Sequence, residues 1–380
     1  MAKSIHLTDV RKVFKSGGKE FEAIDNLSLD IPAGSFTTIV GPSGCGKTTT
    51  LRMLAGLETP TSGQIHFGEE EVTNLRPQER NIAMVFQSIA LYPHMSVREN
   101  IGYGLKIAGV SQAKRNESIE EAARTLQITD QLDKKPAELS GGQQQRVALG
   151  SAFVQNPDVL LLDEPMSDLD AKLKAELRVE VQRLHQELDT TIVYVTHDQT
   201  EAMTMSDNVV LLNEGSLEQF DPPKTLFDYP TSEYVARFIG TPSTNVLECR
   251  IEIIDGVPAV TGHGLEIPLP NQDLSAFTGD DIKIGIRPQY LSLGTGDHSV
   301  EATVEVVEPL GTESVVHART LDDTRLDIVS AAADDLAPGE SIAASFDKDH
   351  LYFFDADGAT QLFGEELTEN QSQAQWGSEQ

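Results

Sequence analysis

The chain has 380 residues, 39% of them hydrophobic, which is enough for two domains that each bury a core. Sixty acidic and 29 basic side chains give a net charge of −31, which repels nucleic acid and argues against it as a partner. The sequence contains no apolar run of membrane-spanning length, and we expect no signal peptide at its start. Cys45 and Cys249 are far apart and lack metal-ligand spacing, so neither a disulfide nor a zinc site is predicted.

Residues 1–240 alternate β-branched runs with amphipathic stretches, a pattern typical of a parallel sheet flanked by helices. Buried strands are predicted at 35–40, 159–162 and 191–195. Between the last two, apolar residues recur every three or four positions and predict one face of a helix; they are Leu173, Leu177, Val181, Leu184 and Leu188. We therefore predict an α/β domain over residues 1–240.

Beyond residue 240 the pattern changes to the alternation of short antiparallel strands. Ile282, Ile284 and Ile286 alternate with polar residues, as do Val300, Ala302, Val304 and Val306. Gly, Pro and Ser/Thr between 240 and 244 mark the expected domain boundary. We predict a small all-β barrel or sandwich over 241–364, followed by a disordered acidic tail over 365–380.

The first chemical motif follows the predicted strand at 35–40. It fits G-x-x-x-x-G-K-T and opens a predicted helix, and its residues are Gly41, Pro42, Ser43, Gly44, Cys45, Gly46, Lys47 and Thr48, with Thr49 next in the chain. Glycines let backbone N–H groups turn inward around phosphates, and the helix N-terminus adds positive charge. Lys47 is expected to reach the β- and γ-phosphates, and the Thr48 hydroxyl to bind Mg²⁺. The alternative is a glycine-rich turn with a chance lysine.

Asp163 and Glu164 end the apolar run at 159–162. Asp163 is expected to contribute to the Mg²⁺ site, directly or through a water molecule. Glu164 then suits a general base, or a group that orients the attacking water. The alternative is that this acidic pair caps a helix, since Pro165 follows it.

A second anion site is predicted before the helix expected near 144–148. It consists of Ser140, Gly141, Gly142 and Gln143, and it has no lysine of its own. One chain does not need two such sites for one γ-phosphate, so a second copy could use this segment to close over the first copy's nucleotide. On its own, the segment would be an ordinary capped helix.

The order and spacing of these segments resemble the ABC ATPase family across residues 1–240. The resemblance implies that Gln87 contacts Mg²⁺ and the attacking water, that His197 bonds the γ-phosphate, and that residues 140–143 act in trans as the signature loop. Asp170 would end the loop that couples two sites. Phe14 matches the family's adenine-stacking aromatic residue, and Phe21 is the second candidate.

Segments 86–97, 235–242, 285–288 and 310–313 resemble the ATPases of carbohydrate importers, the maltose-transporter type, whose regulatory domain is an OB-like (TOBE-type) barrel. This implies a second ATPase subunit, identical or a close paralogue, and two integral membrane permease subunits. An extracellular solute-binding protein would act indirectly. The chain is then expected at the cytoplasmic face of the cell membrane, with 88–105 as the socket for a permease helix; the alternative for 88–105 is a packed loop. Gln289 and Asp168 depart from the family pattern.

Other functions have less support in the sequence. A soluble ABC ATPase of DNA repair or translation would show a coiled-coil insertion or tandem cassettes, and a GTPase would carry N-K-x-D. An exporter subunit would carry fused spanning helices. Within the importers, a carbohydrate, including a pentose, is the expected solute; glycerol phosphate and polyamine are the alternatives.

The acidic excess suggests a cytoplasm at very high salt, where self-repulsion between carboxylates is screened. If so, circular dichroism should show loss of helicity on dilution into low salt. Unchanged stability would instead favour the alternative, an acidic and well-solvated surface.

Overall fold

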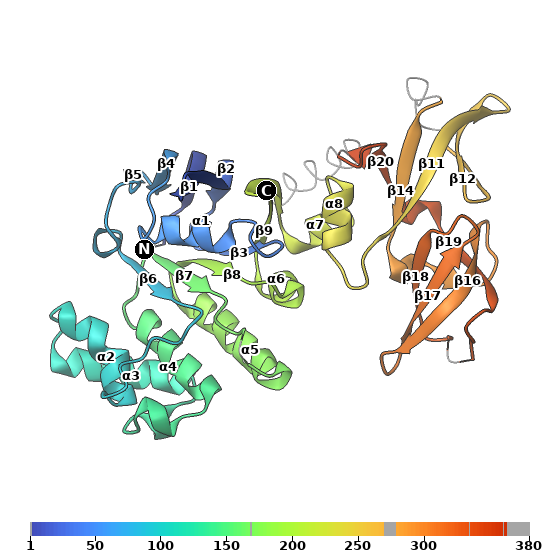
Figure 1. Ribbon diagram of the computed structural model, residues 1–380. Helices are drawn as coiled ribbons and strands as arrows, with labels where there is room; N and C mark the ends of the chain where they lie inside the picture. Colours follow the sequence, from blue (N-terminus) through green and yellow to red (C-terminus); the bar gives the residue numbers. More distant parts are fainter. Residues whose placement is uncertain (1, 168, 270–278, 334, 360, 363–380) are drawn as a thin grey trace, which may run out of the picture. The chain divides into compact units, whose positions relative to one another are not determined.

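The computed structural model describes all residues except 1, 168, 270–278, 334, 360 and 363–380 (Figure 1). The chain forms two compact units, residues 1–224 and 225–380. The sequence-based boundary at 240 therefore differs from the division in the structure. The tail expected over 365–380 lies outside the described residues.

A mostly parallel sheet forms the centre of the first unit, in the order β10-β9-β3-β8-β7-β6 (Figure 1). The strands predicted near 35–40, 159–162 and 191–195 are β3, β7 and β8, and every residue in them is buried. Only β10 pairs antiparallel, with β9. The strands are β3 (Phe36–Val40), β6 (Ile82–Val85), β7 (Val159–Asp163), β8 (Thr191–Val195), β9 (Asn208–Asn213) and β10 (Ser216–Asp221). Because β3, β6, β7 and β8 run parallel, the loops after them meet at one edge of the sheet.

A second, antiparallel sheet of this unit has the order β2-β1-β4-β5. Its strands are β1 (Ile5–Ser16), β2 (Lys19–Ile31), β4 (Ser62–Phe67) and β5 (Glu70–Glu71). In the β1–β2 register, Phe14 lies directly opposite Phe21. Directly opposite residues project from the same face of a sheet, so the two candidate adenine-stacking residues are neighbours.

Helices cover both faces of the parallel sheet. Alternate residues of β7 and β8 accordingly belong to two different hydrophobic cores. Leu161 and Val193 pack with α1, whereas Leu160 and Ile192 pack with α4 and α5. The helices are α1 (Lys47–Leu54), α2 (Val97–Ile107), α3 (Gln112–Thr125), α4 (Gly141–Phe153), α5 (Ala171–Glu187) and α6 (Gln199–Met205). The predicted helical face is confirmed in α5 for Leu177, Val181 and Leu184, which are buried. Leu173 is half-buried, and Leu188 lies just beyond the end of the helix.

The second unit contains two antiparallel sheets that share one core. The six-stranded sheet comprises β11 (Asn245–Ile254), β12 (Val257–Gly262), β13 (Leu265–Pro268), β14 (Asp281–Ile286), β20 (Tyr352–Asp355) and β21 (Gln361–Leu362). The five-stranded sheet comprises β15 (Ser292–Leu293), β16 (His298–Pro309), β17 (Ser314–Thr320), β18 (Arg325–Ser330) and β19 (Ser341–Phe346). The all-β character predicted for this region is confirmed.

One residue of the predicted alternation does not follow it. Val300, Ala302 and Val304 are buried, but Val306 is 54% exposed. The β16–β17 register shifts between Val304 and Val306, which marks a bulge. A one-residue shift moves a side chain to the opposite face of a strand, so the bulge accounts for the exposure of Val306.

Two short helices, α7 (Pro223–Asp228) and α8 (Glu233–Phe238), explain why the unit boundary precedes residue 240. The Arg287 side chain is fully buried and donates hydrogen bonds to the carbonyl oxygens of Phe227 and Ile239. Its guanidinium also lies 3.6 Å from the centre of the Phe227 ring. These contacts tie most of the helical segment after 224 to the β-strands of the second unit.

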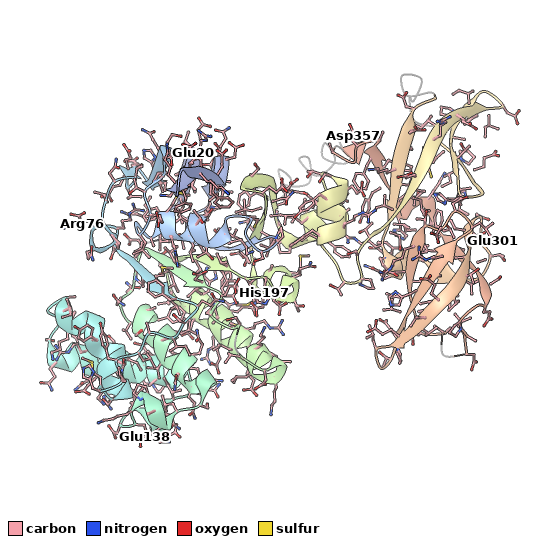
Figure 2. All side chains as sticks on the ribbon, viewed as in Figure 1. Glu20, Arg76, Glu138, His197, Glu301 and Asp357 are labelled. Atoms are coloured by element: carbon pink, nitrogen blue, oxygen red, sulfur yellow. The ribbon has the colours of Figure 1, made fainter. Side chains whose placement is uncertain are left out.

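Two surface properties complete the description. Exposed carboxylates such as Glu138 and Glu301 occur in both units (Figure 2). Across the described ranges, no helix has the length and apolar character needed to cross a membrane.

Candidate nucleotide-binding site

The loop between β3 and α1 depends on glycine at two positions. Gly41 and Gly46 have φ of 151° and 106°, values that other residues rarely adopt. An added Cβ would lie 2.2 Å from the Leu212 carbonyl oxygen at Gly41, and 2.4 Å from the Ile24 Cδ1 atom at Gly46. Packing beneath the loop therefore excludes side chains here and holds the backbone in its turn.

Lys47 begins α1 and is 7% exposed. Its Nζ donates to the carbonyl oxygens of Gly41 at 2.8 Å and Pro42 at 2.9 Å. The loop thus holds the ammonium group against its own backbone, at the N-terminus of a helix. Both the ammonium and the helix N-terminus favour an anion at this place.

Two carboxylates lie at the end of β7, where Asp163 is the last residue of the strand and Glu164 follows it. The Thr48 hydroxyl donates to Asp163 Oδ1 at 3.3 Å. Burial raises the pKa of the Asp163 carboxyl above its ordinary value, and the nearby Glu164 carboxylate adds to the rise, while the Thr48 hydrogen bond opposes it. The next residue, Glu164, has a positive φ of 44°, and its N–H donates to the Val195 carbonyl oxygen at 2.9 Å. Glu164 thus sits in a strained turn that is anchored to β8.

Gln87 and His197 converge on one oxygen of Glu164. Gln87 Nε2 donates to Glu164 Oε2 at 3.0 Å, and His197 Nδ1 lies 3.4 Å from the same atom. Gln87 follows β6 and His197 follows β8. These two strands lie on either side of β7 in the sheet (Figure 1). Three side chains that are far apart in sequence therefore meet because their strands are adjacent and parallel.

A cavity of about 420 Å³ lies over the loop. Its lining contains most of the expected nucleotide-binding residues, and comprises Phe21, Ala23, Ser43, Gly44, Gly46, Lys47, Thr48, Thr49, Glu164 and His197. Phe21 is 61% exposed and lines the cavity, whereas Phe14 is not among the lining residues and has Lys12 Nζ 4.7 Å from its ring centre. Ala23 carries no recognisable signal in the sequence, so sequence reasoning missed it.

The predicted signature segment lies in the same unit but outside this lining. Ser140 caps α4, accepting from the Gln143 N–H at 3.4 Å, and the Gln143 side chain accepts from the Ser140 N–H at 3.0 Å. Asp170 caps α5, its carboxylate accepting from the Leu173 N–H at 3.0 Å. An added Cβ on Gly142 would lie 2.1 Å from Leu173, so α4 and α5 pack closely at these two caps. Ser140 and Gly141 are exposed to solvent.

The oxygen atoms beside the loop fit a magnesium ion. Thr48, Asp163 and Gln87 supply hydroxyl, carboxylate and amide oxygens, the ligand types that Mg²⁺ prefers. Among the described residues, no group of three or more His, Cys, Asp or Glu side chains is gathered to hold a metal. Mg²⁺ in nucleotide sites is usually bound through one or two carboxylates together with phosphates and water, so such a group is not required.

Comparison with known proteins gives concordant similarities. Residues 24–167 match the family described as ABC transporter, and residues 284–354 match the TOBE domain. The chain is 45% identical over 349 residues to the sn-glycerol-3-phosphate import ATP-binding protein UgpC 2 of Agrobacterium fabrum, covering 91% of this chain and 92% of that relative. It is 44% identical over 375 residues to the xylose/arabinose import ATP-binding protein XacK of Haloferax volcanii, covering 96% and 97%. The dimeric structure of MJ0796, a bacterial ABC transporter cassette, superposes with a TM-score of 0.53 at 31% identity, covering 58% of this chain and 98% of that one.

The raised pKa of Asp163 leads to a stability prediction. The folded state holds this proton more tightly than the unfolded state, so Asp163 lowers stability as the pH rises through and above its ordinary pKa. Asp163→Asn should therefore raise the thermal unfolding midpoint at pH 7. The gain should shrink as the pH falls toward the ordinary range of a carboxyl pKa, and an equal gain at every pH would contradict this assignment.

Proposed function

Because this chain belongs to the ABC transporter family, we propose that it is the ATP-hydrolysing subunit of an importer and acts as one half of a dimer. The convergence of Gln87 and His197 on Glu164, beside the phosphate loop, carries this proposal. An anion-binding loop alone would support nucleotide binding. A carboxylate with two polar neighbours at the same cavity supports hydrolysis.

In the proposed reaction, Glu164 accepts a proton from the attacking water, or orients that water toward the γ-phosphate. The turn with φ of 44° projects its carboxylate beside the cavity. The Gln87 side-chain N–H donates to Oε2 of Glu164, and this hydrogen bond limits the positions that the carboxylate adopts. His197 lies at the exposed edge of this group and donates to the γ-phosphate.

The phosphates are held by the loop and by Lys47. The Lys47 ammonium already faces the Gly41 and Pro42 carbonyl oxygens, so it exchanges these partners for β- and γ-phosphate oxygens. Thr48, Gln87 and Asp163 would hold Mg²⁺, which supplies charge neutralisation at the phosphates when bound. Phe14 and Phe21 lie opposite each other, and Phe21, which lines the cavity, is the better candidate to stack on the adenine.

A second ATPase subunit, identical or a close paralogue, supplies the missing anion contacts. Ser140 and Gly141 are exposed at a helix N-terminus that does not line this chain's own cavity. Such a cap is suited to close over the γ-phosphate held by the partner subunit. Asp170 caps the adjoining helix, so the signature and coupling loops would reach the partner as one packed surface.

A groove of about 690 Å³ in the first unit suits a membrane partner. It contains exposed apolar side chains, including Phe86 at 41%, Tyr92 at 44% and Ile107 at 71% exposure. Phe86 lines the groove and directly precedes Gln87, which donates to the Glu164 carboxylate. A helix bound in the groove would therefore lie one residue along the chain from Gln87. Residues 90–92, 100 and 103–105 of the expected 88–105 socket line it. We assign it to a short helix of one of two integral membrane permease subunits, which places this chain at the cytoplasmic face of the membrane.

The solute is proposed to be a carbohydrate, delivered by an extracellular solute-binding protein. The xylose/arabinose relative supports a sugar. The relatives that import sn-glycerol-3-phosphate support glycerol phosphate as a second candidate. Their identities of 45% and 44% are as high as the 44% of the xylose/arabinose relative, so identity does not decide between the two solutes. Uptake of each labelled solute by vesicles containing the complete transporter would distinguish them.

Replacing the proposed base tests the mechanism. Glu164→Gln removes the proton acceptor but preserves shape, so turnover should fall by roughly 10²–10⁴-fold while ATP still binds. Size-exclusion chromatography with ATP should then show a persistent dimer. Lys47→Ala is the contrasting variant: it should weaken ATP binding itself, about 10- to 100-fold, because it removes a charge-assisted contact. Normal turnover by Glu164→Gln would exclude Glu164 as the base.

Two exposed apolar residues, one inside the groove and one outside it, allow a matched test of this assignment. Ile107→Glu places a charge in the groove and should reduce co-purification with the membrane subunits by at least about tenfold, since burying an unpaired charge is costly. Val179→Glu makes the corresponding change on α5, outside the groove, at 65% exposure. This variant should assemble normally with the membrane subunits. Both variants should keep the wild-type affinity for ATP. Equal assembly of the two would place the membrane partner elsewhere.

A further inference from the structure

A buried carboxylate accepts a hydrogen bond from Thr196, the residue that precedes His197. Glu201, in α6, is only 2% exposed. Its Oε2 accepts hydrogen bonds from the Tyr194 hydroxyl at 2.6 Å and from the Thr196 hydroxyl at 2.7 Å. Tyr194 is completely buried, and Thr196 is 3% exposed. Glutamate is seldom buried to this degree unless partners hold it, because the charged form loses its hydration.

The Thr196 hydroxyl makes a second hydrogen bond, with the backbone of Asp198, the residue that follows His197. While it donates to Glu201, it accepts from the Asp198 N–H at 3.0 Å. The Asp198 carboxylate in turn caps α6, accepting from the N–H groups of Thr200 at 2.8 Å and Glu201 at 3.3 Å. The two residues that flank His197 are therefore both fixed by side-chain hydrogen bonds.

The same turn is tied to neighbouring parts of the site. The Thr196 N–H donates to the Ile39 carbonyl oxygen at 3.4 Å, in the strand that leads into the phosphate loop. Lys174 of α5 lies 3.9 Å from the Asp198 carboxylate. The His197 side chain is exposed, and its Nδ1 lies 3.4 Å from Glu164 Oε2. Its position therefore follows from the turn that carries it.

The chemistry of the network favours a positioning role over simple packing. Burial, together with the neighbouring Glu201 carboxylate, raises the pKa of Tyr194 well above its usual value, so the phenol remains a hydrogen-bond donor. Apolar residues of similar volume would close the β8–α6 contact without the cost of burying a carboxylate. What they would not supply is an acceptor that orients the Thr196 hydroxyl toward the turn.

We propose that Glu201 is a positioning residue for ATP hydrolysis, acting through the Tyr194 and Thr196 hydroxyls to hold His197 against Glu164. The inference rests on the proposed role of His197 at the γ-phosphate. Glu201 touches neither the nucleotide nor the water. It restricts the turn 196–198, and a displacement of about 1 Å in a catalytic group is enough to lower a rate about 100-fold.

The test uses two threonine positions that undergo the same change. Thr196→Val keeps the β-branched shape but removes the hydroxyl, and should lower kcat about 10- to 100-fold while the KM for ATP changes less than about twofold. Thr73→Val is the control: Thr73 is 6% exposed, its hydroxyl bonds the backbone of Ile65, and it lies outside the site. It should lose comparable stability in urea but retain kcat. Thr196→Ser should restore most of the lost turnover.

A double-mutant cycle separates positioning from general damage. Thr196→Val and Glu201→Leu are each combined with His197→Ala, and residual rates are followed in single-turnover assays. If Glu201 acts through His197, neither change lowers the rate further once the imidazole is gone. The proposal is overturned if Thr196→Val keeps the wild-type kcat, if Thr196→Ser fails to restore turnover, or if the losses multiply in the His197→Ala background.

The cycle also distinguishes this inference from the proposed function. If His197→Ala alone hydrolyses ATP at the wild-type rate, the role of His197 in the proposed function is wrong, and the inference falls with it. If His197→Ala is impaired but the losses multiply, the proposed function stands and only the role of Glu201 is wrong.

Discussion

The site depends on one oxygen atom, Oε2 of Glu164, to which Gln87 donates and which His197 approaches. Each of these residues follows a different strand, and the parallel arrangement of β6, β7 and β8 brings the three loops together. The Glu164 backbone occupies a strained conformation held by the Val195 carbonyl oxygen. Strain of this kind persists where the surrounding structure fixes it, and here the buried strands on both sides provide that restraint.

Nucleotide binding and hydrolysis make different demands on this unit. The phosphate loop is complete within one chain, since its glycines, Lys47 and the start of α1 pack together. The caps of α4 and α5 pack against each other but do not line the cavity, and they expose Ser140 and Gly141. A chain that binds ATP alone but hydrolyses it only when paired is the arrangement these two facts favour. In the proposed mechanism, closure of the dimer would move the groove beside Phe86, and with it the helix of the membrane partner.

The second unit is organised by a different interaction. Arg287 is buried with its guanidinium on the Phe227 ring and its N–H groups on two carbonyl oxygens of the segment 227–239. A buried guanidinium needs all these acceptors, because an unpaired charge would be costly. The segment that ends the α/β region in the sequence therefore belongs structurally to the β-unit. Local composition at 240–244 marks a loop, but composition does not reveal which core a preceding helix joins.

The sequence by itself determined the motifs whose chemistry is local. Residues 41–48 identify the phosphate loop because glycine spacing, a lysine and a helix start are all consecutive, and β3, β7 and β8 follow from uninterrupted apolar runs. Only the tertiary structure showed that Phe21 rather than Phe14 lines the cavity, that Val306 is turned outward by a bulge, and that Glu201 bonds the hydroxyl of Thr196, next to His197. These features arise from strand register and from contacts between distant segments, and neither leaves a periodic signal in a single chain.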